Sequence, residues 1–420
     1  MSDDGAWSRR MLAITPAAIG VGVGCSFLLG AVLKLANSLE HGVWVALPEA
    51  AGFPPDSWWW ILGVLTATGL AVGLVVAYLP GHAGPDPATE GLVAPPHAVS
   101  VVPGLLIAVT LALAGGVSLG PENPIIASSV ALACALGVAW RGPATTPLWV
   151  GLASAGTIGA MFGTPVAAAL VLSEMPGTDP REPLWDRLFA PLVAAGAGAV
   201  TTQLLGQPVF AVAVPRYPGL RLIDVVSGSV IAVAACALGL GIVALFPVAH
   251  AMFCRFRHPV IMLTCGGLVL GLLGVIGGRI TLFKGLHEMQ ELTADVAAYS
   301  TLGLVLIIAV KAGALLVAAS SGFRGGRIFP TVFIGVAIGL LASRIAPGVP
   351  TGVAIGSAVL GIVLAITHQG WLSLLMAAAV VADTTLLPIL AIAVLPAWLF
   401  VRSRHGMVIE EPAPPRPTPA

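Results

Sequence analysis

The sequence Gly115-Gly116-Val117-Ser118-Leu119-Gly120-Pro121-Glu122-Asn123-Pro124 interrupts two apolar runs, residues 101–114 and 125–139. Inside hydrocarbon an unpaired backbone amide is costly, so such a break persists only where it lines a cavity or is buried in protein. Glycine lets the chain turn and approach another group closely, and Pro124 suits the first position of a new helix. Glu122 is then an ionisable side chain at membrane depth beside a helix N-terminus, which predicts a functional site.

A second break with the same pattern lies in the other half of the chain. Residues 320–330 separate the apolar runs 302–319 and 331–342. In both breaks a glycine is followed four residues later by a proline, Gly120 to Pro124 and Gly326 to Pro330. Matching interruptions in two halves of a membrane protein indicate a binding site near the membrane midplane. Because helix N-termini carry partial positive charge and free N–H groups, we expect the ligand to be an anion.

The composition is that of a polytopic membrane protein. Of 420 residues, 57% are hydrophobic and 9% are charged. Nineteen basic residues balance nineteen acidic ones, which gives no electrostatic reason to expect a nucleic acid as partner. The first apolar run is expected to be a membrane helix and not a removed signal peptide. We find no Ser/His/Asp, metal-spaced or P-loop set, so the sequence predicts no enzyme activity, no metal site and no cofactor.

The apolar segments predict an all-α fold with broken helices. There are about a dozen of them, and several are shorter than the roughly 20 residues needed to cross a membrane. Short and unequal segments indicate tilted, broken and re-entrant helices. Two of the segments span residues 148–172 and 372–400.

The chain is expected to consist of two membrane repeats. We place a cytoplasmic N-terminus at residues 1–10, the first repeat at 11–206, a linker at 207–222 and the second repeat at 223–401. Residues 402–420 are expected to be a short, disordered cytoplasmic tail without a regulatory domain. Arg9 and Arg10 precede the first span and Arg402 and Arg404 follow the last, so both termini are expected in the cytoplasm.

Glu122 is the strongest candidate for a functional side chain. Lying among anion-binding amides, its carboxylate could compete with the anion and leave when it is protonated. One residue would then be both a gate and a proton carrier. For Asn123 two interpretations remain open: the side chain contributes an N–H group, or it merely tolerates the turn.

The second break offers the backbone amides of residues 326–329. For the side chains of Arg324 and Arg327, reaching a vestibule or pairing with an acid is favoured over binding the anion. Glu174 is expected to accept hydrogen bonds at a helix end, which is favoured over proton transfer. Lys311 lies alone in an apolar run and needs a partner.

Other polar residues receive structural interpretations. Asp383 is expected to cap a helix N-terminus, and the hydroxyl of Thr384 or Thr385 could contact a permeating ion. A solvated face outside the membrane is predicted for His287, Glu288 and Glu291. The five cysteines show no paired spacing and are expected to be small buried hydrophobic residues, with no metal or disulfide role: Cys25, Cys134, Cys236, Cys254 and Cys265.

In these motifs the chain resembles the CLC family of chloride channels and proton-coupled chloride exchangers, over about residues 12–400. Residues 120–124 are similar to the family's G-(K/R)-E-G-P, which implies that Glu122 is the external gating glutamate. Residues 326–330 resemble G-x-F-x-P, whose amides hold the central anion. Residues 162–165, with Glu174 nine residues after Pro165, resemble the family's apolar helix that ends in a glutamate, and Gly81-His82-Ala83-Gly84-Pro85 precedes them all.

The chain departs from the family's motifs at several positions. Where G-S-G-x-P offers its serine to chloride, Ala83 stands here, followed by Gly84. The pore tyrosine, two residues after an Asp, would be Thr385. The family's Phe is displaced by one residue to Phe329, which leaves Ile328 in its place.

The proton glutamate of the exchangers has two possible positions. An ungapped alignment from Pro165 places it at Met175 and makes Glu174 the neighbouring structural glutamate. Alignment on the Glu-Met pair instead makes Glu174 the proton glutamate. We prefer the ungapped alignment, because a gap of one residue inside a helix rotates its faces by about 100°.

The resemblance implies a homodimer with inverted repeats and one anion pathway per subunit, in a multi-pass protein of the cell membrane. Its function would be chloride transport, as a voltage- or pH-gated channel or as a proton-coupled exchanger. One alternative is a fluoride or other small-anion exporter of the same family. From another class, a cation-coupled solute symporter would require further acids in the spans. The predicted anion-binding residues are Ala83, Gly84, Gly120, Pro121, Asn123, Gly326, Arg327, Ile328, Phe329 and Thr385.

Overall fold

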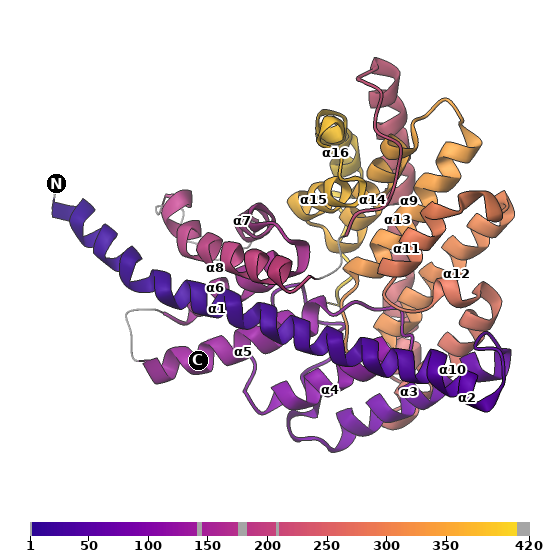
Figure 1. The fold of residues 1–420 in the computed structure, drawn as a ribbon, viewed down its shortest axis with the longest axis horizontal. Coiled ribbons are helices and arrows are strands. Elements are labelled where there is room, and N and C mark those ends of the chain that lie inside the picture. The colour runs from indigo at the N-terminus through magenta and orange to yellow at the C-terminus, as the bar shows by residue number, and fades with distance from the viewer. Residues whose placement is uncertain (1, 141–144, 175–182, 207–209, 410–420) are drawn as a thin grey trace, which may run out of the picture.

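The computed structural model describes residues 2–140, 145–174, 183–206 and 210–409 (Figure 1). Within these ranges the regular structure is helical, with one isolated β-bridge, which confirms the predicted all-α class. Eight of the described helical segments are long and apolar enough to cross a membrane. Residues 207–209 of the expected linker and 410–420 of the expected tail lie outside the described residues.

The helices of the amino-terminal part run from α1 to α8. They are α1 (Ser2–His41), α2 (Leu47–Ala51), α3 (Trp58–Tyr78), α4 (Val101–Ala114), α5 (Glu122–Trp140), α6 (Thr146–Phe162), α7 (Pro165–Ser173) and α8 (Leu184–Leu204). A π-helical turn, Gly42–Ala46, joins α1 to α2, and a short 3-10 helix covers Pro80–Ala83. In Figure 1 the long helix α1 runs diagonally across this part of the molecule, and it packs against α8, α6 and α4.

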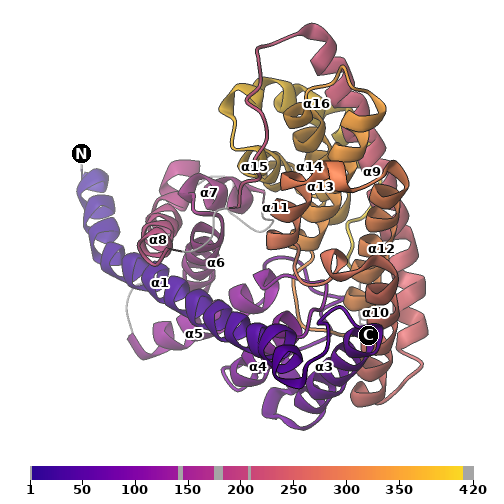
Figure 2. The ribbon, with the colours of Figure 1, turned by 45° about the vertical axis from the view of Figure 1, so that its right-hand side comes forward.

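The helices of the carboxy-terminal part run from α9 to α16. They are α9 (Leu222–Phe253), α10 (Pro259–Gly277), α11 (Leu286–Ala294), α12 (Thr301–Ser320), α13 (Ile328–Ile345), α14 (Thr351–Thr367), α15 (Gly370–Val381) and α16 (Leu387–Val401). Three short 3-10 helices lie between them, at Arg279–Thr281, Val296–Ala298 and Thr384–Leu386. Figure 2 shows α15 and α16 gathered with α14 at one end of the molecule.

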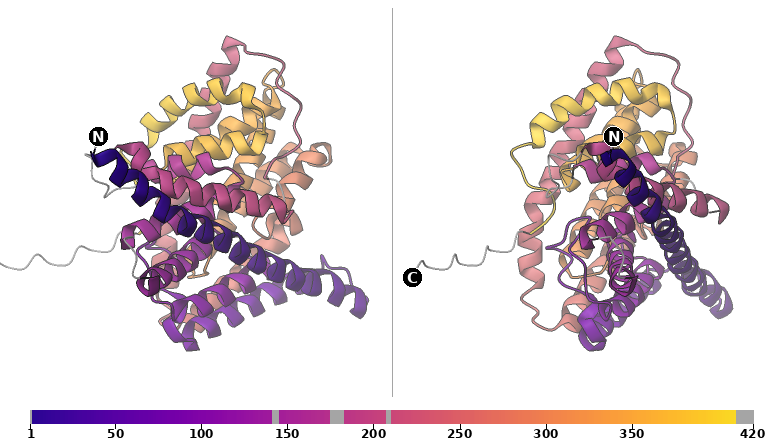
Figure 3. Two further views of the ribbon diagram at one scale, coloured as in Figure 1. Left: turned by 60° about the vertical axis from the view of Figure 1, so that its left-hand side comes forward. Right: turned by 90° about the vertical axis from the view of Figure 1, so that its left-hand side faces the viewer.

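Close helix contacts join the two parts. α10 packs along α3, and a Cβ added at Gly69 of α3 would lie 2.2 Å from the Leu263 carbonyl oxygen. On the facing helix, a Cβ at Gly267 would lie 2.3 Å from the Leu65 carbonyl oxygen. Small residues at such positions let membrane helices approach closely enough for their backbones to touch. Figure 3 shows α3 and α4 at the opposite end of the molecule from α16, with α1 and α8 between them.

Two of the apolar segments are each divided into two helices. Residues 148–172 divide into α6 and α7, because Gly163 has a φ of +66° and Pro165 starts the next helix. Residues 372–400 divide into α15 and α16, because Ala382 has a φ of +52° and a 3-10 turn follows. A left-handed residue after the last turn ends a helix, and hydrophobicity gives no signal of it.

Both helices that follow the breaks begin earlier than their prolines. α5 begins at Glu122 and α13 at Ile328, two residues before Pro124 and Pro330. A proline in the first turn of a helix costs no hydrogen bond, because the N–H group that it lacks would have had no partner within the helix. Because α5 begins before Pro124, Glu122 is a residue of α5 itself.

Candidate functional site

The two breaks meet at the centre of the site. The Gly120 N–H donates to the Gly326 carbonyl oxygen at 2.8 Å, and the Gly326 N–H donates back to the Gly120 oxygen at 2.6 Å. This reciprocal pair is the isolated β-bridge of the described structure. It brings the first turns of α5 and α13, separated by about half the chain, to one point.

The carboxylate of Glu122 occupies this meeting point. Its Oε1 accepts the N–H of Phe329 at 2.8 Å, and the side chain is completely buried. A Cβ at Gly120 would lie 2.1 Å from Oε2, and one at Gly326 would lie 2.0 Å from it. Both positions must therefore be glycine for the carboxylate to lie where it does. The acid takes a free N–H group of the α13 N-terminus, the position that suits an anion.

Oε2 of Glu122 has no hydrogen-bond partner within the described residues. Ile328 and Phe329 are the first two residues of α13, and both are buried beside the bridge. Pro121 is buried as well, while the Asn123 side chain donates to the Gly91 carbonyl oxygen at 3.0 Å. The Asn123 amide thus ties the start of α5 to the segment between α3 and α4.

The arginines of the second break bind backbone carbonyls. Arg324 Nη2 donates to the oxygens of His82 at 3.2 Å and Gly84 at 2.9 Å, and so holds the turn that contains buried Ala83. Arg327 donates to the carbonyl oxygens of Met407 and Pro87. Both guanidinium groups therefore bind the chain itself, and residues 82–87 lie against the second break.

Glu174 is placed at a helix end. Its Oε1 accepts the N–H of Trp371, in the first turn of α15, at 3.0 Å. Burial raises the pKa of Glu174, while hydrogen bonds from the Trp371 and Gly370 backbone oppose that shift. Met175, the other candidate for the proton glutamate position, lies outside the described residues.

Asp383 and Thr385 form a local cap at the start of the 3-10 helix Thr384–Leu386. Asp383 accepts the N–H of Thr385 at 3.0 Å, and the Thr385 hydroxyl donates to the same oxygen at 2.6 Å. The second Asp383 oxygen accepts the N–H of Tyr217 at 3.0 Å. The expected N-cap at Asp383 is confirmed. The Thr385 hydroxyl, a candidate for contact with the ion, donates its hydrogen bond to this cap.

A cavity of about 260 Å³ reaches the site. Pro121 and Phe329, which flank the Glu122 carboxylate, line one part of it. The rings of Phe162, Phe210 and Phe329 form a cluster with centroids 4.9–6.4 Å apart. The cavity provides space from which a small ion could approach the buried carboxylate.

Lys284 in the wall of this cavity is a site residue that the sequence did not reveal. Burial lowers its pKa, and the carboxylates of Glu40, Glu288 and Glu122 oppose that shift. In the sequence Lys284 is one cation in a short loop, and only the folded loop places it in the cavity that reaches the Glu122 site. His287 and Glu291 are exposed as predicted, whereas Glu288 is half-buried near Lys284.

Lys311 finds its partners in that same loop. Its Nζ donates to the carbonyl oxygens of Thr281, Leu282 and Phe283 at 3.1, 2.8 and 2.8 Å. The Phe283 N–H in turn donates to the Gly116 oxygen of the first break at 2.9 Å. Lys311 therefore fixes the loop that carries Lys284 against the first break.

Comparison with known proteins gives relatives over almost the whole chain. Proteins named "Putative ion-transport protein YfeO" from Escherichia coli (strain K12 / DH10B) and Shigella boydii serotype 18 are each 49% identical over 405 residues. Each match covers 96% of this chain and 97% of the relative.

Solved structures share the fold at low sequence identity. A slow cyanobacterial Cl⁻/H⁺ antiporter has a TM-score of 0.79 at 15% identity, over 93% of this chain and 94% of that one. A CLC-type fluoride/proton antiporter has a TM-score of 0.70 at 18% identity, over 92% and 95%. A eukaryotic CLC transporter has a TM-score of 0.72 at 14% identity, over 95% and 73%.

These similarities confirm the CLC-like fold of inverted repeats with broken helices. The sequence profile described as "Voltage gated chloride channel" matches residues 57–402, which is most of the chain. Together with the helices that could cross a membrane and the paired breaks, this match fixes the family. The chain belongs to the voltage-gated chloride channel (CLC) family of membrane transport proteins.

Proposed function

We propose that this protein moves a small anion across the membrane and that the Glu122 carboxylate is its gate. The observation that carries the proposal is the hydrogen bond from the Phe329 N–H to Glu122 Oε1. A helix N-terminus at membrane depth is an anion site, and here the protein's own carboxylate fills it. An anion from the adjoining cavity can take that position only after the carboxylate leaves.

Protonation supplies the means for the gate to open. A neutral carboxyl group has a weaker attraction to the N-terminus of α13 than a carboxylate has, so proton uptake favours its exchange for an external anion. The buried amide that the acid releases needs a new acceptor, and a halide supplies one. The positive charge of the Lys284 side chain, in the cavity wall, would attract anions towards the gate.

Chloride is the proposed ion, exchanged for protons, and fluoride is the second candidate. Two of the solved proteins with this fold are a Cl⁻/H⁺ antiporter and a fluoride/proton antiporter. Fluoride is retained because one of these two proteins is a fluoride/proton antiporter. The candidate ion contacts of this chain are backbone amides, while the Thr385 hydroxyl is engaged with Asp383.

The assembly and orientation proposed from the sequence complete this function. We propose a homodimer with one pathway per subunit, in the cell membrane, with both termini in the cytoplasm. Residues 11–206 and 223–401 are proposed as the two inverted repeats, with residues 207–222 as the linker.

The test is anion efflux from liposomes that contain the purified protein, with external pH recorded in the same experiment. Wild-type protein should move chloride more slowly as external pH rises, because the gate then stays deprotonated. Glu122→Gln should show chloride flux independent of pH and without proton movement. Repeating the assay with fluoride separates the two candidate ions.

The matched control is Glu291→Gln on α11, an exposed glutamate whose neutralisation should leave the pH profile of wild type. A sodium gradient is imposed in parallel. Flux that follows sodium and ignores the halide would favour a cation-coupled symporter. An unchanged pH dependence in Glu122→Gln would contradict the assignment of the gate.

A further inference from the structure

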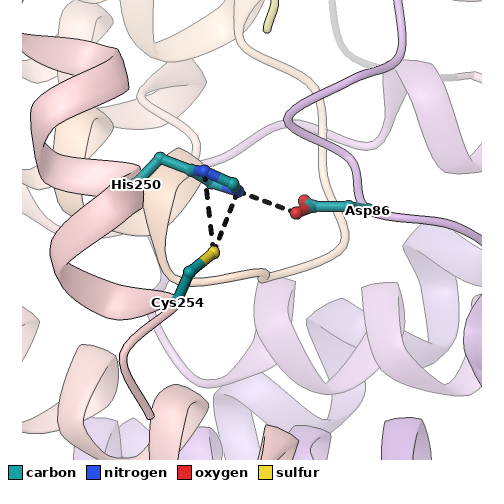
Figure 4. A group of neighbouring side chains, drawn as sticks. All are labelled: Asp86, His250 and Cys254. Carbon is teal, nitrogen blue, oxygen red and sulfur yellow. Dashed lines mark hydrogen bonds and ion pairs between the residues drawn. The ribbon is translucent and has the colours of Figure 1, made fainter. Parts of the chain in front are cut away.

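Three side chains able to bind a metal ion meet at the carboxy-terminal end of α9 (Figure 4). Asp86 comes from the segment between α3 and α4, His250 lies in the last turn of α9, and Cys254 directly follows that helix. His250 Nε2 is 2.7 Å from Asp86 Oδ2, and Cys254 Sγ is 3.5 Å from the same nitrogen. The three ligand atoms all lie within 4.8 Å of one another.

The three ligand atoms are close enough to share a tetrahedral ion once the side chains rotate. With Zn–S of about 2.3 Å and Zn–N of about 2.05 Å, a tetrahedral angle gives an N···S separation of about 3.6 Å. Cys254 Sγ lies 3.5 Å from His250 Nε2 and 3.6 Å from Nδ1, so the Cys254 side chain must also turn towards the lone pair of Nε2. The corresponding N···O separation is about 3.3 Å, so the Asp86 carboxylate would move outward by about 0.6 Å from its 2.7 Å contact. A side-chain rotation provides such a movement. A fourth position remains for water.

The surroundings hold the ligands and leave them accessible. Asp86 Oδ1 accepts the Ala88 N–H at 2.9 Å, which orients the carboxylate while Oδ2 faces His250. Hydrogen bonds of this kind to a ligand support a metal site. Cys254 is exposed, in contrast to the prediction that the cysteines are buried hydrophobic residues. It follows the last residue of α9, where the apolar helix has ended.

We propose that Asp86, His250 and Cys254 form a binding site for a thiophilic divalent transition-metal ion such as Zn²⁺. Imidazole and thiolate ligands select ions of this class over Mg²⁺ and Ca²⁺, which prefer oxygen. This site corrects the expectation, drawn from the sequence, that the chain has no metal site. The sequence pattern that indicates it is the i, i+4 spacing of His250 and Cys254, and the fold brings Asp86 as the third ligand.

The site is linked to the second break through direct contacts. The Pro87 carbonyl oxygen, one residue after Asp86, accepts from Arg327, the residue that follows Gly326. The Arg327 guanidinium also lies 5.0 Å from the ring centroid of Phe246, one turn before His250 on α9. A bound ion would join residues 86–87 to α9 and restrict the Arg327 position. We infer that the metal slows anion movement at the bridge, a consequence that rests on the proposed function.

The binding test uses the purified full-length protein in detergent. Titration with Co²⁺ should give a sulfur-to-metal charge-transfer band in wild type, and Cys254→Ser should abolish it. His250→Ala and Asp86→Asn should weaken affinity by at least the roughly tenfold loss seen when a supporting hydrogen bond is removed. Cys265→Ser on α10 is the matched cysteine control and should retain the band.

A second measurement follows the thiol directly. Excess Zn²⁺ should slow the reaction of Cys254 with a maleimide in wild type and should not do so in His250→Ala, where the thiol itself is intact. Absence of the band and of zinc protection in wild type would overturn the site and leave a simple Asp86–His250 ion pair. A band that persists in Cys254→Ser would overturn it as well.

The regulatory consequence is measured separately in liposomes. Micromolar Zn²⁺ should slow anion efflux by wild type and leave efflux by His250→Ala unchanged. Metal binding with unaltered efflux would overturn the coupling while supporting the site. Liposomes that show no anion efflux with or without metal would count against the proposed function. The metal site would still stand on the binding measurements, because these do not depend on transport.

Discussion

Glu122 and the two glycines beside it form a single steric unit. The carboxylate lies where a Cβ would lie if either Gly120 or Gly326 carried a side chain, and it accepts the Phe329 N–H there. The same two residues pair through reciprocal backbone hydrogen bonds. The position of the Glu122 carboxylate therefore depends on glycine at both positions.

Gly326→Ala tests this dependence. The new methyl group would lie 2.0 Å from Oε2, which is too close for two unbonded atoms, so we expect the carboxylate to leave the N-terminus of α13 although Glu122 is still present. Chloride flux in liposomes should then lose its pH dependence, as in Glu122→Gln. Crowding of a packed interior should lower the free energy of unfolding by about 1–3 kcal/mol.

The control for that substitution is Gly63→Ala on α3, an exposed position where the added methyl group meets nothing within 4 Å. Its flux should match that of wild type at every pH. Wild-type pH dependence in Gly326→Ala would show that the carboxylate does not need this space.

Single residues differ in how far the sequence reveals them. The importance of Glu122, Gly120 and Gly326 was predictable, because a glycine lies four residues before a proline in both breaks. A helix break at membrane depth is stable only where it lines a cavity or is buried in protein. Lys284 was not predictable, because its position depends on contacts between three segments. Its loop is fixed to Lys311 of α12 and to the first break.

The connection between α10 and α11 is the element whose position most depends on one side chain. Residues 281–283 give three carbonyl oxygens to Lys311, which also lies 4.9 Å from the ring centroid of Phe333. A buried ammonium group with three hydrogen bonds is compensated, whereas three buried carbonyls without a donor would not be. The loop and the first break are therefore held together by a cation in the core.

Lys311→Met should release this loop. We expect a loss of about 3 kcal/mol in the free energy of unfolding, because buried carbonyls lose a charged donor. Hydrogen exchange should accelerate at the Phe283 N–H, which now binds the Gly116 oxygen. Lys34→Met on α1 is the control, since Lys34 is exposed. Equal thermal unfolding of the two variants would contradict this account of the loop.

Helix boundaries show which elements a sequence can define. α3 and α4 begin and end at the residues where their apolar runs do, Trp58–Tyr78 and Val101–Ala114. The apolar runs alone do not mark the divisions between α6 and α7 and between α15 and α16. Each division has one left-handed residue, Gly163 or Ala382, after the last turn of the first helix. Hydrophobicity is insensitive to a single backbone angle.

At the scale of the whole molecule, the amino- and carboxy-terminal parts are joined at several points. α10 packs along α3, the two breaks share a bridge, and Glu174 at the end of α7 binds the first turn of α15. Inverted repeats follow from the paired breaks in the sequence. The contacts that hold the repeats together could not be predicted, because no pattern in one helix specifies its partner.

Glu174→Ala tests the last of these joints. Removing the acceptor leaves the Trp371 N–H without its partner, and loss of such a helix cap costs about 1 kcal/mol. We expect a lower midpoint of thermal unfolding and unchanged proton movement in the liposome assay. Glu174→Gln, which keeps an oxygen acceptor, should unfold close to wild type. Loss of proton movement in both variants would instead assign Glu174 to the proton pathway.

The bond between Glu122 and Phe329 has a consequence for the synthesis of the protein. Its two residues are 207 positions apart in the chain. When α5 reaches the membrane during translation, the ribosome has not yet made Phe329, whose N–H group will bind the Glu122 carboxylate. Glu122 is the first residue of α5, so an acid without its later partner enters the membrane at the start of this helix, and the apolar remainder of α5 must compensate for it alone. The contact of Glu122 with α13 is therefore assembled late in biogenesis, and α5 should be less securely inserted in truncated nascent chains than in the full-length protein.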